Sequence, residues 1–188
     1  MTSSIVEQAR VISTCYHQGQ WRRSSYRQGQ LGRTAKLPYI VHPQNVAKIL
    51  YHHGYDDETT QAIAWLHDTL EDTAITYEQL SELFGKKIAQ GVYLLTRNVD
   101  REEYKQRLLT ANTILQIIKI ADTVDNLLTL DALTPQGIKR KIVDTQHFYL
   151  PLAKKIAPAL AQEMERVLRS YQQDHPSWRS PLPSESLH

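Results

Sequence analysis

Apolar residues recur three to four positions apart along almost the whole chain, with polar residues between them. This spacing is typical of amphipathic helices, whereas a half-buried strand alternates at every second residue. No segment shows sustained alternation flanked by turn residues, so the sequence predicts an all-α helical bundle, and we expect no sheet. At 188 residues the chain is long enough for one ordinary core and short for two, which predicts a single domain.

Capping residues and helix breakers place the individual helices. Ser3 or Ser4 can cap a first helix that ends near Gly19, and proline at a first helical position predicts a second helix that opens at His42-Pro43 and stops at Gly54. Further helices are expected from about Asp57 to Leu70, from Thr76 to Gly85, from Lys86 to about Thr96, from Arg101 onward, from Ile114 to Leu130, and in two segments that Pro151 bends or separates. The segment 114–130 is rich in Ile, Val and Leu, which predicts a central, largely buried helix.

Two segments interrupt this helical pattern. Residues 16–25 are followed by a near copy of themselves at 26–35, and we interpret this tandem duplication as an enlarged or inserted loop at about residues 16–37. Residues 173–188 form a tail rich in Pro and Ser, which we expect to be poorly ordered. The predicted domain therefore covers residues 1–172.

Composition excludes several function classes. Lys and Arg total 22 against 20 Asp and Glu, a formal net charge of +2, so no overall field would recruit nucleic acid or an anionic membrane. Cys15 is the only cysteine, which rules out an internal disulfide and fits a reducing compartment. The N-terminus lacks a signal-peptide pattern, and no stretch is long and apolar enough to span a membrane. We therefore expect a soluble, cytoplasmic protein, whose oligomeric state the sequence leaves open.

Ionisable side chains are concentrated in the segment Ala64-Trp65-Leu66-His67-Asp68-Thr69-Leu70-Glu71-Asp72-Thr73. His67 and Glu71 are one helical turn apart, and so are Asp68 and Asp72, so on a continuous helix all four lie on one side. Three carboxylates this close raise one another's pKa values unless a cation or solvent relieves the repulsion. A divalent metal would do so.

Two distant residues are candidates to complete such a site. His42 stands at a helix start, where its ring is free of helical packing, and Asp122 follows the apolar run Ile117-Ile118-Lys119-Ile120-Ala121. A carboxylate in a buried helix must be paired, ligated or protonated. Two imidazoles and two carboxylates suit Mn, Fe, Zn or Mg-like ions, and such a centre favours hydrolysis.

These residues resemble the pattern of the HD phosphohydrolase superfamily, in which a His-Asp pair combines with an upstream His and a downstream Asp. The flanking words are more specific. Pro38-Tyr39-Ile40-Val41-His42-Pro43, the word at residues 66–73, and Lys119-Ile120-Ala121-Asp122 with Asn126 look like the hydrolase domain of the RelA/SpoT family, whose stand-alone form is the small alarmone hydrolase. The resemblance covers roughly residues 5–130 in order.

The resemblance implies an activity and a set of roles. In that family the domain uses Mn²⁺ to remove pyrophosphate from the ribose 3′ position of (p)ppGpp, the alarmone of the stringent response. By carry-over the metal ligands would be His42, His67, Asp68 and Asp122. Glu71 and Asp72 would act on the attacking water, and Asn126 and Thr129 would lie near the nucleotide. A phosphorylated nucleotide is then the expected ligand.

This chain departs from the family in two places. The family's His-x-Gly-Gln word and basic loop match His17-Gln18-Gly19-Gln20 with Arg22, Arg23 and Ser24, which we expect to bind substrate, but the duplicated segment intervenes before Pro38. The second copy offers only Arg33-Thr34-Ala35, so we favour the first. Between Asp122 and Asn126 the usual Arg-Leu-His is replaced by Thr123-Val124-Asp125, which loses a cation and gains an acid.

These departures leave two other functions open. The same metal chemistry could act on another phosphorylated nucleotide, such as NADPH or a 2′- or 3′-phosphate ester. A different class of function would be a non-catalytic nucleotide sensor or partner-binding module that keeps the fold. The Glu71-Asp72 pair argues against this last possibility, because acids at a helix C-terminus are electrostatically unfavourable without a role.

Overall fold

The computed structural model describes residues 3–24 and 35–178. Its helices are α1 (Ile5–Tyr16), α2 (Val41–His52), α3 (Glu58–Leu66), α4 (Thr69–Asp72), α5 (Tyr77–Leu95), α6 (Arg101–Thr110), α7 (Thr113–Leu127), α8 (Pro135–Asp144), α9 (Leu150–Ile156) and α10 (Pro158–Asp174). It also contains two strands, β1 (Trp21–Ser24) and β2 (Ala35–Pro38), two short 3₁₀ helices, η1 (Leu130–Ala132) and η3 (Pro176–Trp178), and a short π-helix, η2 (Thr145–Tyr149). The fold is all-α, as the periodicity predicts.

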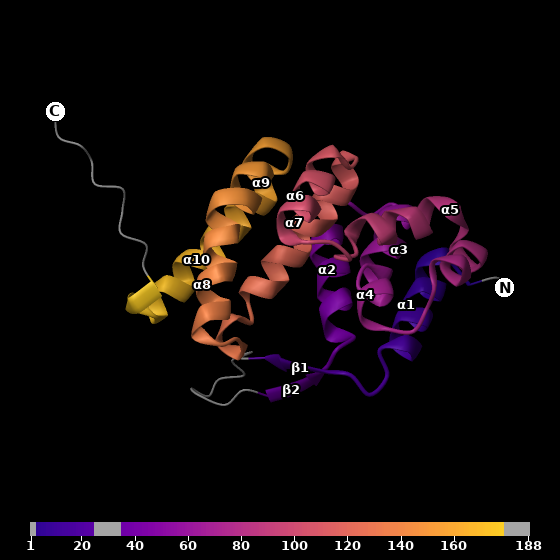
Figure 1. Cartoon of the computed structure of the whole chain (residues 1–188), viewed down its shortest axis with the longest axis horizontal. Coiled ribbons are helices and arrows are strands. Elements are labelled where there is room, and N and C mark those ends of the chain that lie inside the picture. The colour runs from indigo at the N-terminus through magenta and orange to yellow at the C-terminus, as the bar shows by residue number, and fades with distance from the viewer. Residues whose placement is uncertain (1–2, 25–34, 179–188) are drawn as a thin grey trace.

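Helix α7 lies at the centre of the bundle (Figure 1). It contacts α2, α3, α5 and α6 toward one side and α9 and α10 toward the other. Most of its apolar side chains are buried, and Ile118, Ile120 and Val124 have no exposed surface. The expected buried central helix is confirmed, with Asn112 as its N-cap in place of a start at Ile114. None of the helices in the described residues is long and apolar enough to cross a membrane.

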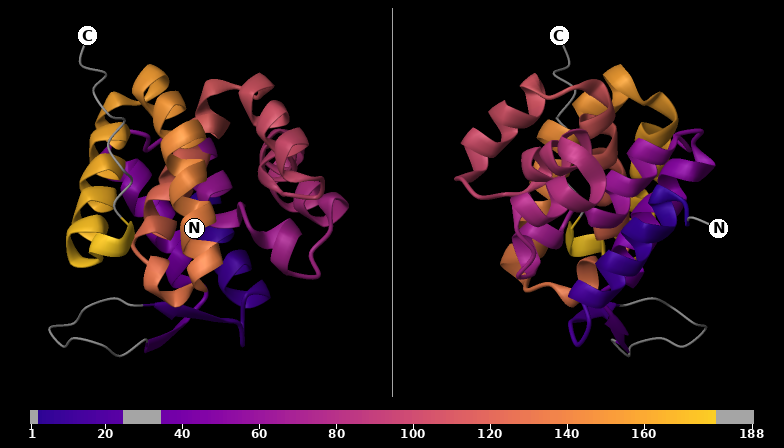
Figure 2. Two further views of the ribbon diagram at one scale, coloured as in Figure 1. Left: turned by 60° about the vertical axis from the view of Figure 1, so that its left-hand side comes forward. Right: turned by 90° about the vertical axis from the view of Figure 1, so that its right-hand side faces the viewer.

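A small hairpin lies at one end of the bundle, where the sequence predicted no sheet (Figure 2). Strands β1 and β2 are antiparallel, with Trp21 opposite Pro38 and Arg22 opposite Leu37. Each strand has only four residues, too few to show an alternating pattern. Gly19, at φ +80°, lies in the turn that leads from α1 into β1. Residues 25–34, which contain most of the second duplicated copy, lie outside the described residues, as does the tail from residue 179.

The helix that carries the His-Asp pair is not continuous, which corrects the expected helix from Asp57 to Leu70. Helix α3 ends at Leu66, and α4 begins at Thr69. The Thr69 hydroxyl donates a hydrogen bond of 2.7 Å to the Leu66 carbonyl, which satisfies one of the carbonyls that the break exposes. His67 and Asp68 therefore lie at the junction of two helices.

The C-terminal helices also differ from expectation. Pro151 lies in the first turn of α9, where its missing N–H is tolerated, and the wide turn η2 precedes it. The chain breaks instead at Ala157, before Pro158 opens α10. Thr76 caps α5 in a capping box, and this helix kinks at Gly85, where φ is +80°, so the two helices predicted there lie end to end.

Candidate metal centre

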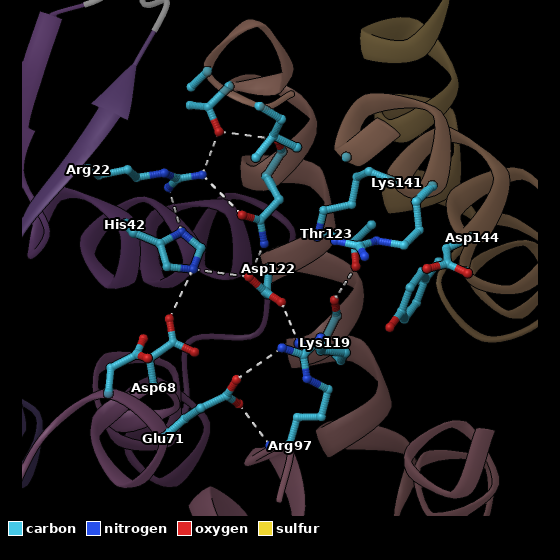
Figure 3. Close-up of a pocket in the computed structure, with 18 of the residues that line it drawn as sticks. Arg22, His42, Asp68, Glu71, Arg97, Lys119, Asp122, Thr123, Lys141 and Asp144 are labelled. Carbon is cyan, nitrogen blue, oxygen red and sulfur yellow. Dashed lines mark hydrogen bonds and ion pairs between the residues drawn. The ribbon is translucent and has the colours of Figure 1, made fainter. Parts of the chain in front are cut away.

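Four side chains from three parts of the chain converge at one point, and Figure 3 shows three of them, those of His42, Asp68 and Asp122. His42 comes from the first turn of α2, His67 and Asp68 from the α3–α4 junction, and Asp122 from the middle of α7. The His42 Nε2 lies 3.0 Å from Asp122 Oδ1 and 3.3 Å from Asp68 Oδ2. The His67 Nε2 lies 3.2 Å from Asp68 Oδ2 and 3.8 Å from Asp122 Oδ1. The structure thus brings together the four residues that the sequence predicted as ligands.

The hydrogen bonds of His67 show that the residues suit a metal. Its Nδ1 lies 2.8 Å from the Ala64 carbonyl oxygen, which can only accept, so this nitrogen carries the hydrogen. The Nε2 is buried and has no hydrogen-bond partner among the described residues. When the ring is neutral, its Nε2 therefore has a lone pair that faces Asp68 and Asp122 and can bind a divalent metal. Potential ligand atoms of His42, His67 and Asp122 all lie within 4.8 Å of one another.

The buried carboxylates of the site favour a positive charge between them. Burial alone would lower the pKa of His67, but Asp68 and Asp122 raise it to about 9. Burial alone would raise the pKa of Asp122, yet Lys119 and the two histidines hold it well below its usual value. The carboxylates therefore stay ionised. Their negative charge is balanced either by protonation of the two histidine rings or by a bound metal ion.

The Nδ1 edge of His42 faces a second carboxylate. Its Nδ1 lies 2.6 Å from Asp125 Oδ2, and the Arg22 guanidinium forms an ion pair with the same oxygen. Asn45 donates a hydrogen bond of 2.8 Å to the other oxygen of Asp125. Burial would raise the pKa of Asp125, but the hydrogen bond from His42 and the charge of Arg22 hold it below its usual value. His42 is buried in the first turn of α2, so its ring is not free of packing as the sequence suggested.

The residues expected near the nucleotide contact one another. Arg22 donates to Thr129 Oγ1 at 2.7 Å and to Asn126 Oδ1 at 3.1 Å. Asn126 in turn donates to Asp122 Oδ1 at 2.6 Å, which links this group to the candidate metal ligands. Arg23 and Ser24 lie on β1, and their side chains are outside what the structure describes.

The acidic pair lies beside the four converging side chains. The Tyr39 hydroxyl is 2.6 Å from Asp68 Oδ2 and 3.0 Å from Asp72 Oδ2. Burial, and then the charges of these two aspartates, raise the pKa of Tyr39, so the hydroxyl keeps its proton and donates it. The Arg97 amide donates to Glu71 Oε2 at 2.8 Å. Both acids are therefore held at fixed positions at the rim of the site.

His42, Asp68, Asp122 and the acidic pair line one pocket of about 550 Å³, whereas His67 and Asp125 do not line it. Its other end is rich in cations: Lys119 lies 2.8 Å from Asp122 Oδ2. Arg101, Arg140 and Lys141 line the wall with one acid, Asp144, which pairs with Arg101 at 3.0 Å. In Figure 3, Lys119 and Lys141 lie on the opposite side of Asp122 from His42. Burial lowers the pKa of Lys141 against the attraction of Asp122, and repulsion from Lys119 and Arg22 lowers it further. The pocket therefore combines an acidic, metal-binding end with a basic end suited to phosphate.

The sequence did not identify several of these contacts. Tyr39 belongs to the Pro-Tyr-Ile word but carries no pattern that predicts a bond to Asp72. Lys119 precedes Asp122 by one helical turn, and this spacing could have indicated the ion pair. Lys141 lies in the run Lys139-Arg140-Lys141, which reads as a solvated face until the pocket is known.

Comparison with known proteins identifies relatives of this chain. A guanosine-3′,5′-bis(diphosphate) 3′-pyrophosphohydrolase of Aquifex aeolicus is 36% identical over 137 residues, which are 68% of this chain and 20% of the relative. The bifunctional (p)ppGpp synthase/hydrolase SpoT of Escherichia coli K12 is 32% identical over 163 residues, which are 80% of this chain and 22% of SpoT. The chain thus spans about a fifth of the length of these relatives.

A solved structure and a family model describe the fold. A metazoan ortholog of SpoT, described as hydrolysing ppGpp, superimposes with a TM-score of 0.74 over 91% of this chain and 97% of its own, at 22% sequence identity. At this identity the likeness concerns the fold alone. Residues 20–157 match the family model of the HD domain. This match covers most of the chain, and the chain therefore belongs to the HD-domain family.

Proposed function

We propose that this protein is a metal-dependent hydrolase that removes the 3′-pyrophosphate from guanosine (p)ppGpp alarmones. The observation that carries the proposal is the buried Nε2 of His67, which has no hydrogen-bond partner among the described residues and lies 3.2 Å from Asp68 Oδ2, beside the Nε2 of His42. The names of the relatives supply the substrate, which we transfer to this chain as part of the proposal. Cytoplasmic location and residues 1–172 as one functional domain belong to the same proposal.

The four converging side chains would hold the metal, and Mn²⁺ is the ion that we propose. When bound, a divalent metal polarises phosphoryl oxygens and makes water more acidic. Glu71 and Asp72 lie beside these ligands, and we assign to them the removal of a proton from the attacking water. The water oxygen bonds to the phosphorus, the bond from phosphorus to the ribose 3′ oxygen breaks, and that oxygen leaves as a hydroxyl after it takes up a proton.

Phosphate recognition falls to the cationic end of the pocket. Arg140 and Lys141 project from α8 into the pocket that Asp122 and Lys119 line from α7. A nucleotide with one phosphorylated group at the metal would place its other phosphates toward these cations, because charge-assisted hydrogen bonds to phosphate are stronger than neutral ones. Asn126 and Thr129 remain candidates for contact with the nucleoside between the two ends.

One observation favours a second candidate, a different phosphorylated nucleotide. Arg22 was expected to bind the substrate, but its positive charge is neutralised by an ion pair with Asp125. The cation that the family pattern places near the nucleotide is therefore compensated here. NADPH and 2′- or 3′-phosphate esters could place a phosphate at the metal without a contact from Arg22.

A nucleotide panel separates these functions. We expect Mn²⁺-loaded protein to release pyrophosphate from ppGpp and pppGpp, and to leave NADPH and simple 3′-phosphate esters intact. Phosphate released only from the latter compounds would replace the alarmone with the second candidate. No turnover of any compound, together with tight binding of one of them, would instead indicate a nucleotide sensor.

The charge balance at the site predicts how pH affects stability. His67 has a pKa of about 9 in the folded protein and about 6.5 when unfolded. Because the pKa of His67 is higher in the folded protein, protonation of His67 stabilises the fold. This stabilisation is fully present below pH 6.5 and is lost as the pH rises through 9. We therefore expect the unfolding temperature of chelator-treated protein to fall between about pH 6.5 and pH 9, and added Mn²⁺ to restore it increasingly over the same range.

Differential scanning fluorimetry with EDTA or Mn²⁺ measures both effects, with His67→Gln as the matched variant that cannot titrate. In this variant the slope between pH 6.5 and 9 should be smaller and the response to Mn²⁺ lost. An unfolding temperature of the chelated wild type that does not change across this window would refute the charge balance described for His67.

A further inference from the structure

Asp122 and Asp125 are one helical turn apart on α7, and they contact the two ring nitrogens of His42. Asp122 Oδ1 lies 3.0 Å from Nε2, and Asp125 Oδ2 lies 2.6 Å from Nδ1. The side chains of all three residues are almost fully buried, with exposed fractions of 4% or less. In the resemblance described under Sequence analysis, Asp125 stands where the family pattern has a histidine, so this contact is not carried over from the pattern.

The hydrogen on His42 can occupy either nitrogen, and the neighbours of Nδ1 decide which. Arg22 Nη1 lies 2.7 Å from Nδ1 and can only donate, whereas the Asp125 carboxylate can only accept. If Nδ1 accepted from Arg22, the hydrogen would sit on Nε2, and no lone pair would face Asp122 and Asp68. If Nδ1 donates to Asp125, the Nε2 lone pair is directed into the metal centre.

The surroundings of Asp125 hold it in the accepting role. Arg22 forms an ion pair with Oδ2, and Asn45, one turn after His42 on α2, donates to Oδ1 at 2.8 Å. Both oxygens are therefore occupied by donors, and Arg22, already bonded to Asp125, Asn126 and Thr129, does not need Nδ1 as an acceptor. A carboxylate that accepts from the far nitrogen of a metal-binding histidine fixes the ring and its tautomer and makes the ligand more basic.

We infer that Asp125 is a positioning residue that holds His42 with its hydrogen on Nδ1, so that Nε2 is presented to the metal. The inference rests on the proposed metal site and adds to it an outer carboxylate that the family pattern does not contain. Arg22 then holds Asp125 in place, and the positive charge that binds phosphate must come from the side chains at the other end of the pocket.

The test is the affinity for Mn²⁺ alone, measured by calorimetric titration of the metal-free protein. Asp125→Ala should weaken Mn²⁺ binding by about 10- to 100-fold, which is the usual cost of losing such an outer partner. Asp125→Asn, which is isosteric and whose amide oxygen can still accept from Nδ1, should lose less than about tenfold. This variant keeps the test valid if Asp125→Ala does not fold.

A matched control exists elsewhere in the chain. His53 Nε2 and Glu163 Oε2 form another histidine–carboxylate pair, at 2.7 Å, between α2 and α10 and outside the pocket. Glu163→Gln should leave Mn²⁺ affinity within twofold of the wild type. In the Zn²⁺-loaded protein, proton NMR should show a downfield, slowly exchanging Nδ1–H of His42 in the wild type and in Glu163→Gln, but not in Asp125→Ala.

The double variant Arg22→Met/Asp125→Ala distinguishes orientation from charge balance, because it removes one positive and one negative charge together. If Asp125 orients His42, the double variant binds Mn²⁺ as weakly as Asp125→Ala. Recovery of wild-type affinity would overturn the inference in favour of charge compensation, and so would unchanged affinity in Asp125→Ala. Failure of the wild type to bind Mn²⁺ would instead overturn the proposed metal site itself.

Discussion

Replacing Asp122 with asparagine is expected to abolish divalent-metal binding and reduce nucleotide hydrolysis more than a hundredfold. Asp122 Oδ1 lies 3.0 Å and 3.8 Å from the Nε2 atoms of His42 and His67, and Oδ2 pairs with Lys119 at 2.8 Å. Both oxygens therefore face groups that need an acceptor or a negative charge. Loss of a residue that hydrogen-bonds to a metal ligand lowers metal affinity or activity by about 10- to 100-fold, so loss of a direct ligand should lower them more.

Asparagine cannot satisfy both sides of this position. With its amide oxygen toward the histidines, its NH₂ group faces the Lys119 ammonium, and in the reverse orientation it faces the histidines. The Asn126 amide, which donates to Asp122 Oδ1 at 2.6 Å, fits only the first orientation. In either case the Lys119 ammonium loses its counter-charge. The unpaired ammonium then repels a metal ion at the neighbouring site.

Elemental analysis after dialysis against Mn²⁺ measures the metal, and release of pyrophosphate from ppGpp measures the activity. Glu163→Gln, remote from the pocket, should retain both. A variant Asp122→Asn that still holds one equivalent of Mn²⁺ would remove this carboxylate from the ligand set, and with it the reason for placing the metal between α2 and α7.

The sequence predicted the fold and much of the site because the relevant patterns are local. Crowding of His67, Asp68, Glu71 and Asp72 within six residues can be recognised in one segment, and Asp122 is conspicuous after an apolar run. The all-α fold and the buried α7 follow from helical periodicity in the same way. These expectations need no knowledge of how distant segments meet.

The remaining features depend on tertiary contacts that no local pattern encodes. The break after Leu66 depends on a side-chain hydrogen bond from Thr69, which competes with the helical backbone and is not visible in propensities. The Arg22–Asp125 pair joins positions 103 residues apart, so a loop cation expected to bind phosphate is neutralised by an acid from the central helix. Lys141 looks like an exposed lysine until α8 and α7 define a common pocket.

Replacing Asp72 with asparagine is expected to separate chemistry from metal binding. Asp72 Oδ2 contacts the Tyr39 hydroxyl at 3.0 Å, while the same hydroxyl lies 2.6 Å from Asp68, so Asp72 is one side chain removed from the candidate ligands. A neutral amide cannot take a proton from water, and loss of general-base catalysis costs about 10²- to 10⁴-fold in rate. Asparagine can still accept from Tyr39, so the local structure should persist.

The measurement is kcat for ppGpp hydrolysis together with Mn²⁺ affinity, in wild type, Asp72→Asn and Tyr39→Phe. We expect Asp72→Asn to lose kcat with Mn²⁺ affinity within about twofold of the wild type, since mutation of a group that acts only in the transition state lowers kcat. Tyr39→Phe should lose less activity, because both carboxylates remain while their shared donor is gone. If Asp72→Asn instead lost the metal and kept kcat at saturating Mn²⁺, Asp72 would be a ligand, and Glu71 alone would remain to accept the proton from water.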